Sequence, residues 1–156
     1  MELPVNHFKH ALAAGRAQIG LWCTLANHYA IEVVAPAGFD WLLLDCEHSP
    51  NDLESLVTQL QAAAAYATHP AVRVPWNDMV TIKRVLDIGA QTILIPMIDT
   101  AEQARAAVSY TRYPPAGVRG VGGTTRATRF GRVPHYAKRA HTELCVLVQV
   151  ETATAL

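Results

Sequence analysis

The stretch from Trp41 to Pro50 places three ionisable side chains directly after a run of apolar residues. Its sequence is Trp-Leu-Leu-Leu-Asp-Cys-Glu-His-Ser-Pro. A short apolar run that ends in turn-forming residues is typical of a buried strand in a parallel sheet. Asp45, Glu47 and His48 then fall at the carboxyl end of that strand, where ligands and catalytic groups collect in α/β folds.

His48 is a candidate for proton transfer, because imidazole gains and releases protons near neutral pH. Asp45, three residues earlier, could accept a hydrogen bond from the ring and fix its tautomer. Asp45 could instead pair with Arg73 across neighbouring strand ends, and Glu47 is a candidate for a supporting position beside a metal. A histidine at the surface or at a helix cap would explain His48 equally well.

Arg73 is a charged residue within a second apolar segment, residues 71–74. Arginine rarely lies unpaired in such surroundings, so Arg73 either forms a structural ion pair or binds a substrate carboxylate or enolate. Gln149 and Glu151 fall at the end of another apolar run, residues 144–150. A glutamate offers the oxygen ligands that Mg²⁺ and Mn²⁺ prefer, although one carboxylate alone is a weak indication of a metal site.

The elements that must position these residues alternate between strand and helix patterns. The predicted strands cover residues 19–23, 41–45, 71–74, 92–96 and 144–150, and helices are expected between them and over 6–14. The helix after the second strand is predicted to begin at Asn51, since Glu54 lies at capping-box spacing. This alternation predicts a parallel α/β sheet. The first predicted strand is not followed by a GxGxxG motif, which speaks against a dinucleotide-binding fold.

A (β/α)8 TIM barrel is the predicted architecture. Such a barrel needs about 250 residues, so this chain would form a single domain, residues 1–156, that covers about the first five β/α units. In a barrel the carboxyl ends of all strands meet at one rim, where active sites lie. The candidate residues would then share that rim; they are Asp45, Glu47, His48, Arg73, Gln149 and Glu151.

The composition excludes several classes of partner. Hydrophobic residues make up 51% of the chain and charged residues 17%, which indicates a globular protein. Thirteen basic residues balance thirteen acidic ones, so the charge gives no reason to expect nucleic acid or a membrane surface as partner. No apolar run approaches the ~20 residues of a membrane span. The expected partner is a small molecule.

The three cysteines, Cys23, Cys46 and Cys145, lie far apart and in or beside apolar runs. They are expected to be buried, reduced thiols, which favours a cytoplasmic location. Residues 1–14 lack the apolar core of a signal peptide, which agrees with that location.

A long segment rich in glycine and proline, residues 113–123, is expected to have a function of its own. Its glycines and Arg119 could present backbone N–H groups to an anion, or the segment could be a flexible turn. The other histidines show no metal-ligand spacing and are expected at the surface or at helix caps; they are His7, His10, His28, His69, His135 and His141.

Several segments together resemble one family of enzymes. They are Gly20–Trp22, Ala37–His48, Arg73–Pro75, Ile95–Met97, Arg112–Gly122 and Val148–Thr152. In this order they are similar to the motifs of the class II pyruvate aldolases, within the hydroxy-oxo-acid aldolase/citrate lyase family. The resemblance extends over essentially all 156 residues.

The resemblance implies a (β/α)8 barrel, a divalent metal (Mg²⁺, Mn²⁺ or Co²⁺) and reversible aldol cleavage of 4-hydroxy-2-oxo acids to pyruvate and an aldehyde. By its motif, His48 would be the catalytic acid/base and Asp45 its partner. Arg73 would bind the pyruvate carboxylate and enolate. Gln149 would hydrogen-bond beside the metal, and Glu151 would be a metal ligand.

The chemistry agrees with the types of residue present. Cleavage of the C–C bond leaves a pyruvate enolate, whose negative charge a metal ion and an arginine can stabilise. A Schiff base is not required, and Lys9, Lys83 and Lys138 fall on predicted helices rather than at strand ends. The resemblance also implies a homo-oligomer, a hexamer built from swapped dimers, with substrate pockets at subunit interfaces.

One feature of the family falls outside the sequence. The family's second metal carboxylate, an aspartate after the sixth strand, would lie beyond Leu156. Two alternatives to the aldolase stay open. The first is a related lyase that acts on another oxo-acid or on a thioester, and the second is a catalytically incomplete chain that functions only within an assembly.

Overall fold

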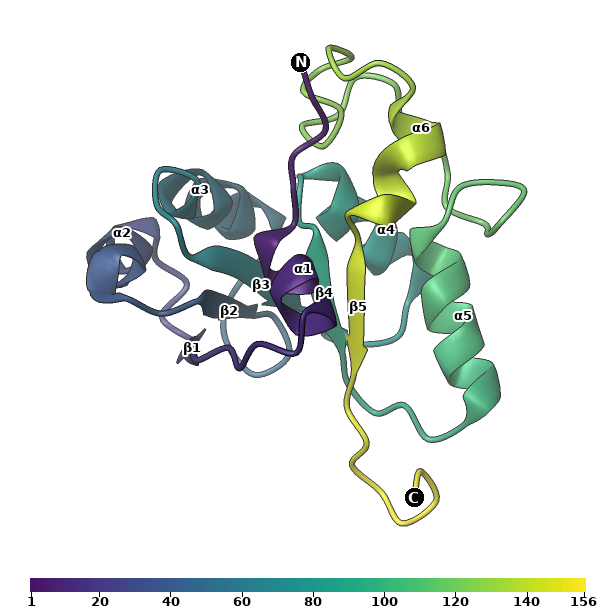
Figure 1. The fold of residues 1–156 in the computed structure, drawn as a ribbon. Coiled ribbons are helices and arrows are strands. Elements are labelled where there is room, and N and C mark those ends of the chain that lie inside the picture. The colour runs from purple at the N-terminus through teal and green to yellow at the C-terminus, as the bar shows by residue number, and fades with distance from the viewer.

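The computed structural model describes residues 1–156, and its central element is a sheet of five parallel strands (Figure 1). The strands are β1 (Gly20–Cys23), β2 (Trp41–Asp45), β3 (His69–Arg73), β4 (Thr92–Ile95) and β5 (Cys145–Val148). They lie side by side in the order of the sequence, and each pairs in parallel with the strand before it. This is the strand order of the first five units of a (β/α)8 barrel, as predicted.

Helices precede the first strand and connect the others. They are α1 (His7–Ala13), α2 (His28–Val34), α3 (Leu53–Ala63), α4 (Met79–Asp87), α5 (Ala101–Thr111) and α6 (Tyr136–Arg139), with 3-10 turns at Ala35–Ala37 and Ala140–Thr142. The three lysines lie on α1, α4 and α6, as predicted. Among all of these helices, not one combines the length and the apolar character that crossing a membrane requires.

The main core lies between the sheet and helices α2 to α5. Alternate strand residues supply the sheet side of this core and are almost completely buried: Leu42, Leu44, Val72, Ile93 and Ile95. Because successive side chains of a strand point to opposite faces, the residues between them face the other, inner side. The last residues of β2 and β3, Asp45 and Arg73, therefore point inward.

Helix α1 closes the inner side of the sheet at the amino ends of the strands. Phe8 stacks on His69 with ring centroids 5.8 Å apart, and it meets Trp41 edge-on at 6.2 Å. His69 is buried, and its Nε2 lies 2.8 Å from the Thr92 hydroxyl. The prediction of His69 as a surface or cap residue is therefore wrong, because β3 begins before the apolar run that marks it in the sequence.

The first turn of α3 also differs from the prediction. Its capping box is formed by Asp52 and Ser55, one residue later than the predicted pair Asn51 and Glu54. The Asn51 side chain instead donates to the carbonyl oxygen of Asp45 at 2.7 Å. Asn51 is therefore unavailable as a cap because it ties the turn back to the end of β2.

The segment 113–123 is fixed to the C-terminal end of α4. Arg119 is completely buried, and its Nη2 lies 2.7 Å from Asp87 Oδ1. The guanidinium also lies over the ring of Tyr113, 4.5 Å from its centroid. Arg119 thus forms a structural ion pair with Asp87, and its charge is not exposed to solvent.

Candidate active site

Asp45 and Arg73 form the centre of the candidate site, at the carboxyl ends of β2 and β3. They are the last residues of their strands and lie directly opposite each other in the parallel register. Nε and Nη2 of Arg73 lie 2.9 and 2.8 Å from the two carboxylate oxygens of Asp45. This bidentate arrangement is the strong geometry for an arginine–carboxylate pair, and both side chains are buried.

Three further side chains surround the guanidinium of Arg73. Its Nη1 lies 2.9 Å from Glu47 Oε2 and 3.4 Å from Gln149 Oε1. The indole of Trp22 on β1 lies against the guanidinium, with 4.8 Å from the ring centroid to Cζ. Trp22 also donates its Nε1–H to Asp45 at 3.3 Å. The ends of β1, β2 and β3 and the segment after β5 thus meet at Arg73.

The central pair is ionised over the whole neutral range. Burial on its own raises the pKa of Asp45, but hydrogen bonds from Arg73, from Trp22 and from the backbone of Glu47 and His48 outweigh burial and lower the pKa to about 2. The hydrogen bond to Asp45, helped by neighbouring carboxylates, raises the pKa of Arg73 despite burial. Neither group of the pair can therefore exchange a proton with a substrate near neutral pH.

His48 lies in the turn after β2 with its imidazole in solvent. The side chain is 73% exposed, and Nε2 lies 3.6 Å from Glu47 Oε1. The backbone N–H of His48 donates to Asp45 Oδ1 at 3.3 Å, whereas the carboxylate oxygens of Asp45 are directed at Arg73. Of the two roles considered for Asp45, the structure shows the pairing with Arg73 and not a hydrogen bond to the ring of His48.

Gln149 and Glu151 follow β5, which ends at Val148 and is shorter than predicted. The side-chain oxygen of Gln149 lies beside Nη1 of Arg73. Glu151 lies at the end of β4, where its Oε2 accepts the backbone N–H of Met97 at 2.8 Å. All six predicted site residues therefore lie at the carboxyl edge of the sheet, and Glu151 contacts the segment after β4.

The residues at this edge fit a divalent cation as one part of its ligand set. Glu151 has a carboxylate oxygen that accepts no hydrogen bond from the protein, and carboxylate oxygens are the ligands that Mg²⁺ and Mn²⁺ prefer. Oε2 of Glu47 is buried and faces Arg73 without a well-formed hydrogen bond. The chain gathers no group of three or more His, Cys, Asp or Glu side chains able to hold a metal. Glu151 therefore fits as one protein ligand of a divalent cation.

Sequence reasoning missed three residues of the site. The Ser49 hydroxyl and the Asn51 amide both donate to the carbonyl oxygen of Asp45 and so fix the turn that carries His48. The sequence Ser-Pro-Asn is a turn signal that could have identified these two, because short polar side chains bond to nearby backbone in turns. The contact of Trp22 depends on strand register, and no sequence signal indicates it.

This geometry defines a class of barrel protein with a buried arginine–aspartate pair at the carboxyl edge of its parallel sheet. Comparison with known proteins identifies the family. The family model described as HpcH/HpaI aldolase/citrate lyase matches residues 18–156. The chain belongs to this family, and the predicted resemblance is confirmed.

Individual relatives agree with this assignment. A Rhizobium etli protein named pyruvate aldolase is 61% identical over 156 residues, which are 100% of this chain and 61% of that protein. A Salmonella heidelberg protein named 4-hydroxy-2-oxo-heptane-1,7-dioate aldolase is 58% identical over 152 residues, 97% of this chain and 58% of that protein. The chain thus spans less than two thirds of the length of these curated relatives.

The fold agrees with a solved structure of the same family. A crystal structure of a family member from Burkholderia cenocepacia superposes with a TM-score of 0.94 at 42% sequence identity. The match covers 97% of this chain and 62% of the other. The predicted fold class is therefore confirmed over the residues present here.

Proposed function

We propose that the protein acts as a metal-dependent aldolase, a carbon–carbon lyase that reversibly cleaves 4-hydroxy-2-oxo acids to pyruvate and an aldehyde. The observation that carries this proposal is the guanidinium of Arg73, held by Asp45 at the carboxyl edge beside Gln149. The names of the relatives support it, and the name of the Salmonella heidelberg protein suggests 4-hydroxy-2-oxoheptanedioate as substrate. Aldol cleavage of that acid to pyruvate leaves succinic semialdehyde as the aldehyde.

Arg73 binds the carboxylate and the enolate oxygen of the pyruvate unit. Asp45 accepts from Nε–H and from one N–H of Nη2, and Gln149 accepts from Nη1, so the second N–H of Nη2 and the N–H of Nη1 that faces Glu47 remain for a substrate. Nη1 already faces the side-chain oxygens of Glu47 and Gln149. Because the guanidinium is fixed before the substrate arrives, it meets the negative charge as it develops during C–C cleavage.

His48 transfers the proton. Its exposed imidazole can reach a bound molecule without displacing other groups, and Glu47 lies close enough to orient the ring. His48 takes the proton of the 4-hydroxyl group as the C–C bond breaks, and a proton must later return to the enolate carbon. Asp45 positions Arg73 and the turn that carries His48.

Glu151 is the ligand that this chain offers to Mg²⁺, Mn²⁺ or Co²⁺, with Glu47 in a supporting position. When bound, the cation supplies positive charge that stabilises the enolate and polarises the oxo group of the substrate. Glu151 fits this role because it brings a hard-oxygen carboxylate to the edge where Gln149 and Arg73 meet the substrate.

We place this activity in a cytoplasmic homo-oligomer, a hexamer by family resemblance, and in aromatic catabolism. Cys23, Cys46 and Cys145 are free thiols and are partly buried, which supports a reducing compartment. The balance of thirteen basic and thirteen acidic residues supports a small-molecule partner rather than nucleic acid or a membrane.

Release of pyruvate tests the proposal directly. The purified protein is incubated with 4-hydroxy-2-oxoheptanedioate and Mg²⁺, Mn²⁺ or Co²⁺, and pyruvate is measured through lactate dehydrogenase and NADH. We expect turnover that a chelator abolishes and that falls by at least about 100-fold in His48→Ala and Arg73→Ala. His28→Ala, an exposed histidine on α2, is the matched control and should keep wild-type turnover.

Two results would contradict the proposal. Full turnover by His48→Ala would show that His48 is not the group that transfers the proton. Release of free coenzyme A from an acyl thioester, with no pyruvate from any hydroxy-oxo acid, would favour the related lyase activity instead. A panel of both substrate types with pyruvate and coenzyme A readouts separates these outcomes.

A further inference from the structure

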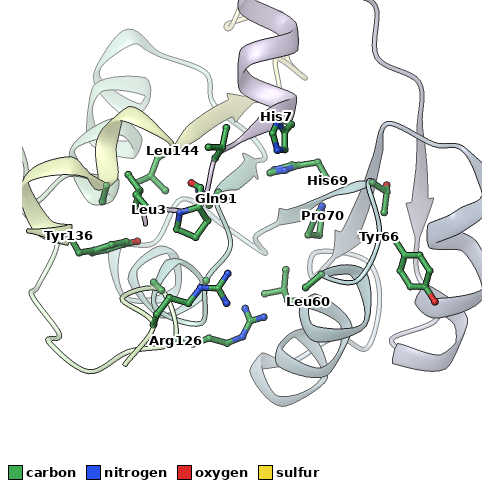
Figure 2. Close-up of a pocket in the computed structure, with 18 of the residues that line it drawn as sticks. Leu3, His7, Leu60, Tyr66, His69, Pro70, Gln91, Arg126, Tyr136 and Leu144 are labelled. Atoms are coloured by element: carbon green, nitrogen blue, oxygen red, sulfur yellow. The ribbon is translucent and has the colours of Figure 1, made fainter. Parts of the chain in front are cut away.

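A cavity of about 490 Å³ opens at the amino ends of the strands, at the opposite end of the sheet from the candidate active site (Figure 2). His69 is the first residue of β3, Gln91 directly precedes β4 and Leu144 directly precedes β5, and all three line the cavity. No residue of the candidate active site lines it. Its volume is in the range of small-molecule sites.

One side of this cavity is positively charged. Arg126 and Arg129 belong to one turn, in which the backbone N–H of Arg129 donates to the carbonyl oxygen of Arg126 at 3.0 Å. Both side chains line the cavity, and no aspartate or glutamate does so. Neither arginine is among the residues that form ion pairs with carboxylates. Figure 2 shows the side chain of Arg126 reaching toward the cavity from its wall.

The guanidinium of Arg126 is held next to a like charge. Nη1 of Arg126 donates to the carbonyl oxygen of Ile88 at 2.8 Å, which leaves its other N–H groups for a ligand. Burial, and to a lesser extent the charge of Arg129, lower the pKa of Arg126. An anion bound between the two arginines would offset this repulsion and satisfy the free donors.

The rest of the wall contains no lysine, arginine or carboxylate. Leu3, Leu60 and Leu144 provide apolar surface, and His69 and Tyr136 add polar rings. Burial lowers the pKa of His69 to about 4, so its ring carries no charge near neutral pH. A ligand that fills the cavity therefore needs an anionic group at one end and an apolar body at the other.

We propose that this cavity binds a small organic anion, with a phosphate or carboxylate group on Arg126 and Arg129 and an apolar body against Leu60 and Leu144. This site does not depend on the aldolase chemistry proposed above, because the two sites lie at opposite ends of the strands. Its ligand would contact the N-terminal segment, the starts of β3 and β5 and the turn of the two arginines together.

Calorimetric titration of the purified protein tests the proposal with four probes: phenyl phosphate, benzoate, inorganic phosphate and phenol. We expect phenyl phosphate or benzoate to bind, inorganic phosphate to bind more weakly, and phenol not to bind. The comparison of phenyl phosphate with benzoate identifies the preferred anionic group. Arg129→Gln and Arg126→Gln should each raise the Kd of the preferred probe about tenfold.

The controls separate this cavity from other basic groups. Arg105→Gln changes an exposed arginine on α5 that pairs with Glu102, and it should bind the probe like the wild type. Arg129 is exposed, so its variant should keep the wild-type circular dichroism spectrum and leave the binding result interpretable.

Three outcomes would overturn the proposal. The first is that neither phenyl phosphate nor benzoate binds at millimolar concentration. The second is that Arg129→Gln and Arg126→Gln bind as tightly as the wild type. The third is equal affinity for inorganic and phenyl phosphate, because the apolar wall would then contribute nothing.

Discussion

Trp22 determines how Arg73 is presented at the candidate active site. Its indole covers one face of the guanidinium at 4.8 Å, and its N–H reaches Asp45 at 3.3 Å. A cation–π contact of this kind contributes about 0.5–2 kcal/mol, and the hydrogen bond adds to it. Trp22 is therefore a positioning residue, because it orients the guanidinium that we propose binds the substrate.

Trp22→Leu removes both contacts, and Trp22→Phe removes only the hydrogen bond. We expect KM for the hydroxy-oxo acid to rise about tenfold in Trp22→Leu and about threefold in Trp22→Phe, with a smaller change in kcat. Steady-state kinetics of pyruvate release measure both constants. Tyr29→Leu, an exposed aromatic residue on α2, is the control. A fall in kcat with unchanged KM would show that Trp22 does not act through substrate binding.

At the scale of the elements, the pairing of β1 with β2 depends on one glycine. Gly20 lies opposite Trp41 in the register, and a Cβ atom at Gly20 would lie 2.0 Å from the Trp41 indole. The same indole donates to the carbonyl oxygen of Gln18 at 3.3 Å. Any side chain at residue 20 must therefore displace the ring and loosen the edge of the sheet that carries Trp22.

Gly20→Ala should lower the free energy of unfolding by about 1–3 kcal/mol, the range for overpacked positions. Gly123→Ala is a matched control, because a Cβ there would meet no atom within 4 Å. Urea unfolding of both variants, followed by tryptophan fluorescence, gives the comparison. Equal stability of Gly20→Ala and Gly123→Ala would show that Trp41 can move away without loss.

Apolar periodicity predicted the elements well where packing alone decides them. The run Trp41–Asp45 is a strand as predicted, and the helix α5 follows β4 as predicted. The start of β3 was missed because it consists of His69 and Pro70, and the contact of His69 with Phe8 of α1 is not visible in the local sequence. The error at Asn51 has a similar origin, since a bond to Asp45 across the turn outweighs the local capping preference.

The residues of the candidate site were predictable, but the contacts between them were not. Asp45, Arg73 and Gln149 were expected at one edge of the sheet because each lies at the end of an apolar run. Which of the two partners Asp45 takes depends on strand register, because the register sets Asp45 directly opposite Arg73. A single sequence does not contain that information, and for the same reason it does not reveal Trp22.

At the scale of the whole molecule, the two ends of the sheet carry different chemistry. The carboxyl end holds the ionised pair Asp45 and Arg73 with further carboxylates around it. The amino end holds α1, the neutral ring of His69 and the two arginines of the cavity. Because all strands run in parallel, their carboxyl ends lie together at one edge and their amino ends at the other, which keeps these two groups of side chains apart.

The ionised pair also links the stability of the whole molecule to pH. The pKa of Asp45 is about 2 in the folded protein, below its ordinary value of 3.8, because its hydrogen bonds outweigh burial. Its stabilising contribution is therefore complete above pH ~4 and is lost as the pH falls toward ~2. The size of the shift corresponds to about 2 kcal/mol of the free energy of unfolding.

Urea unfolding of the wild type and of Asp45→Asn at pH 6, 4, 3 and 2 measures this linkage. At pH 6 we expect Asp45→Asn to be less stable by about 3 kcal/mol, because the buried guanidinium loses its main partner. The difference should shrink between pH 4 and pH 2, since protonation removes the same charge from the wild type. Asn51→Ala is a neutral change in the same turn, so its free energy of unfolding should stay below that of the wild type by a constant amount over this pH range. A constant difference for Asp45→Asn as well would mean that Arg73 does not hold Asp45 in its ionised form.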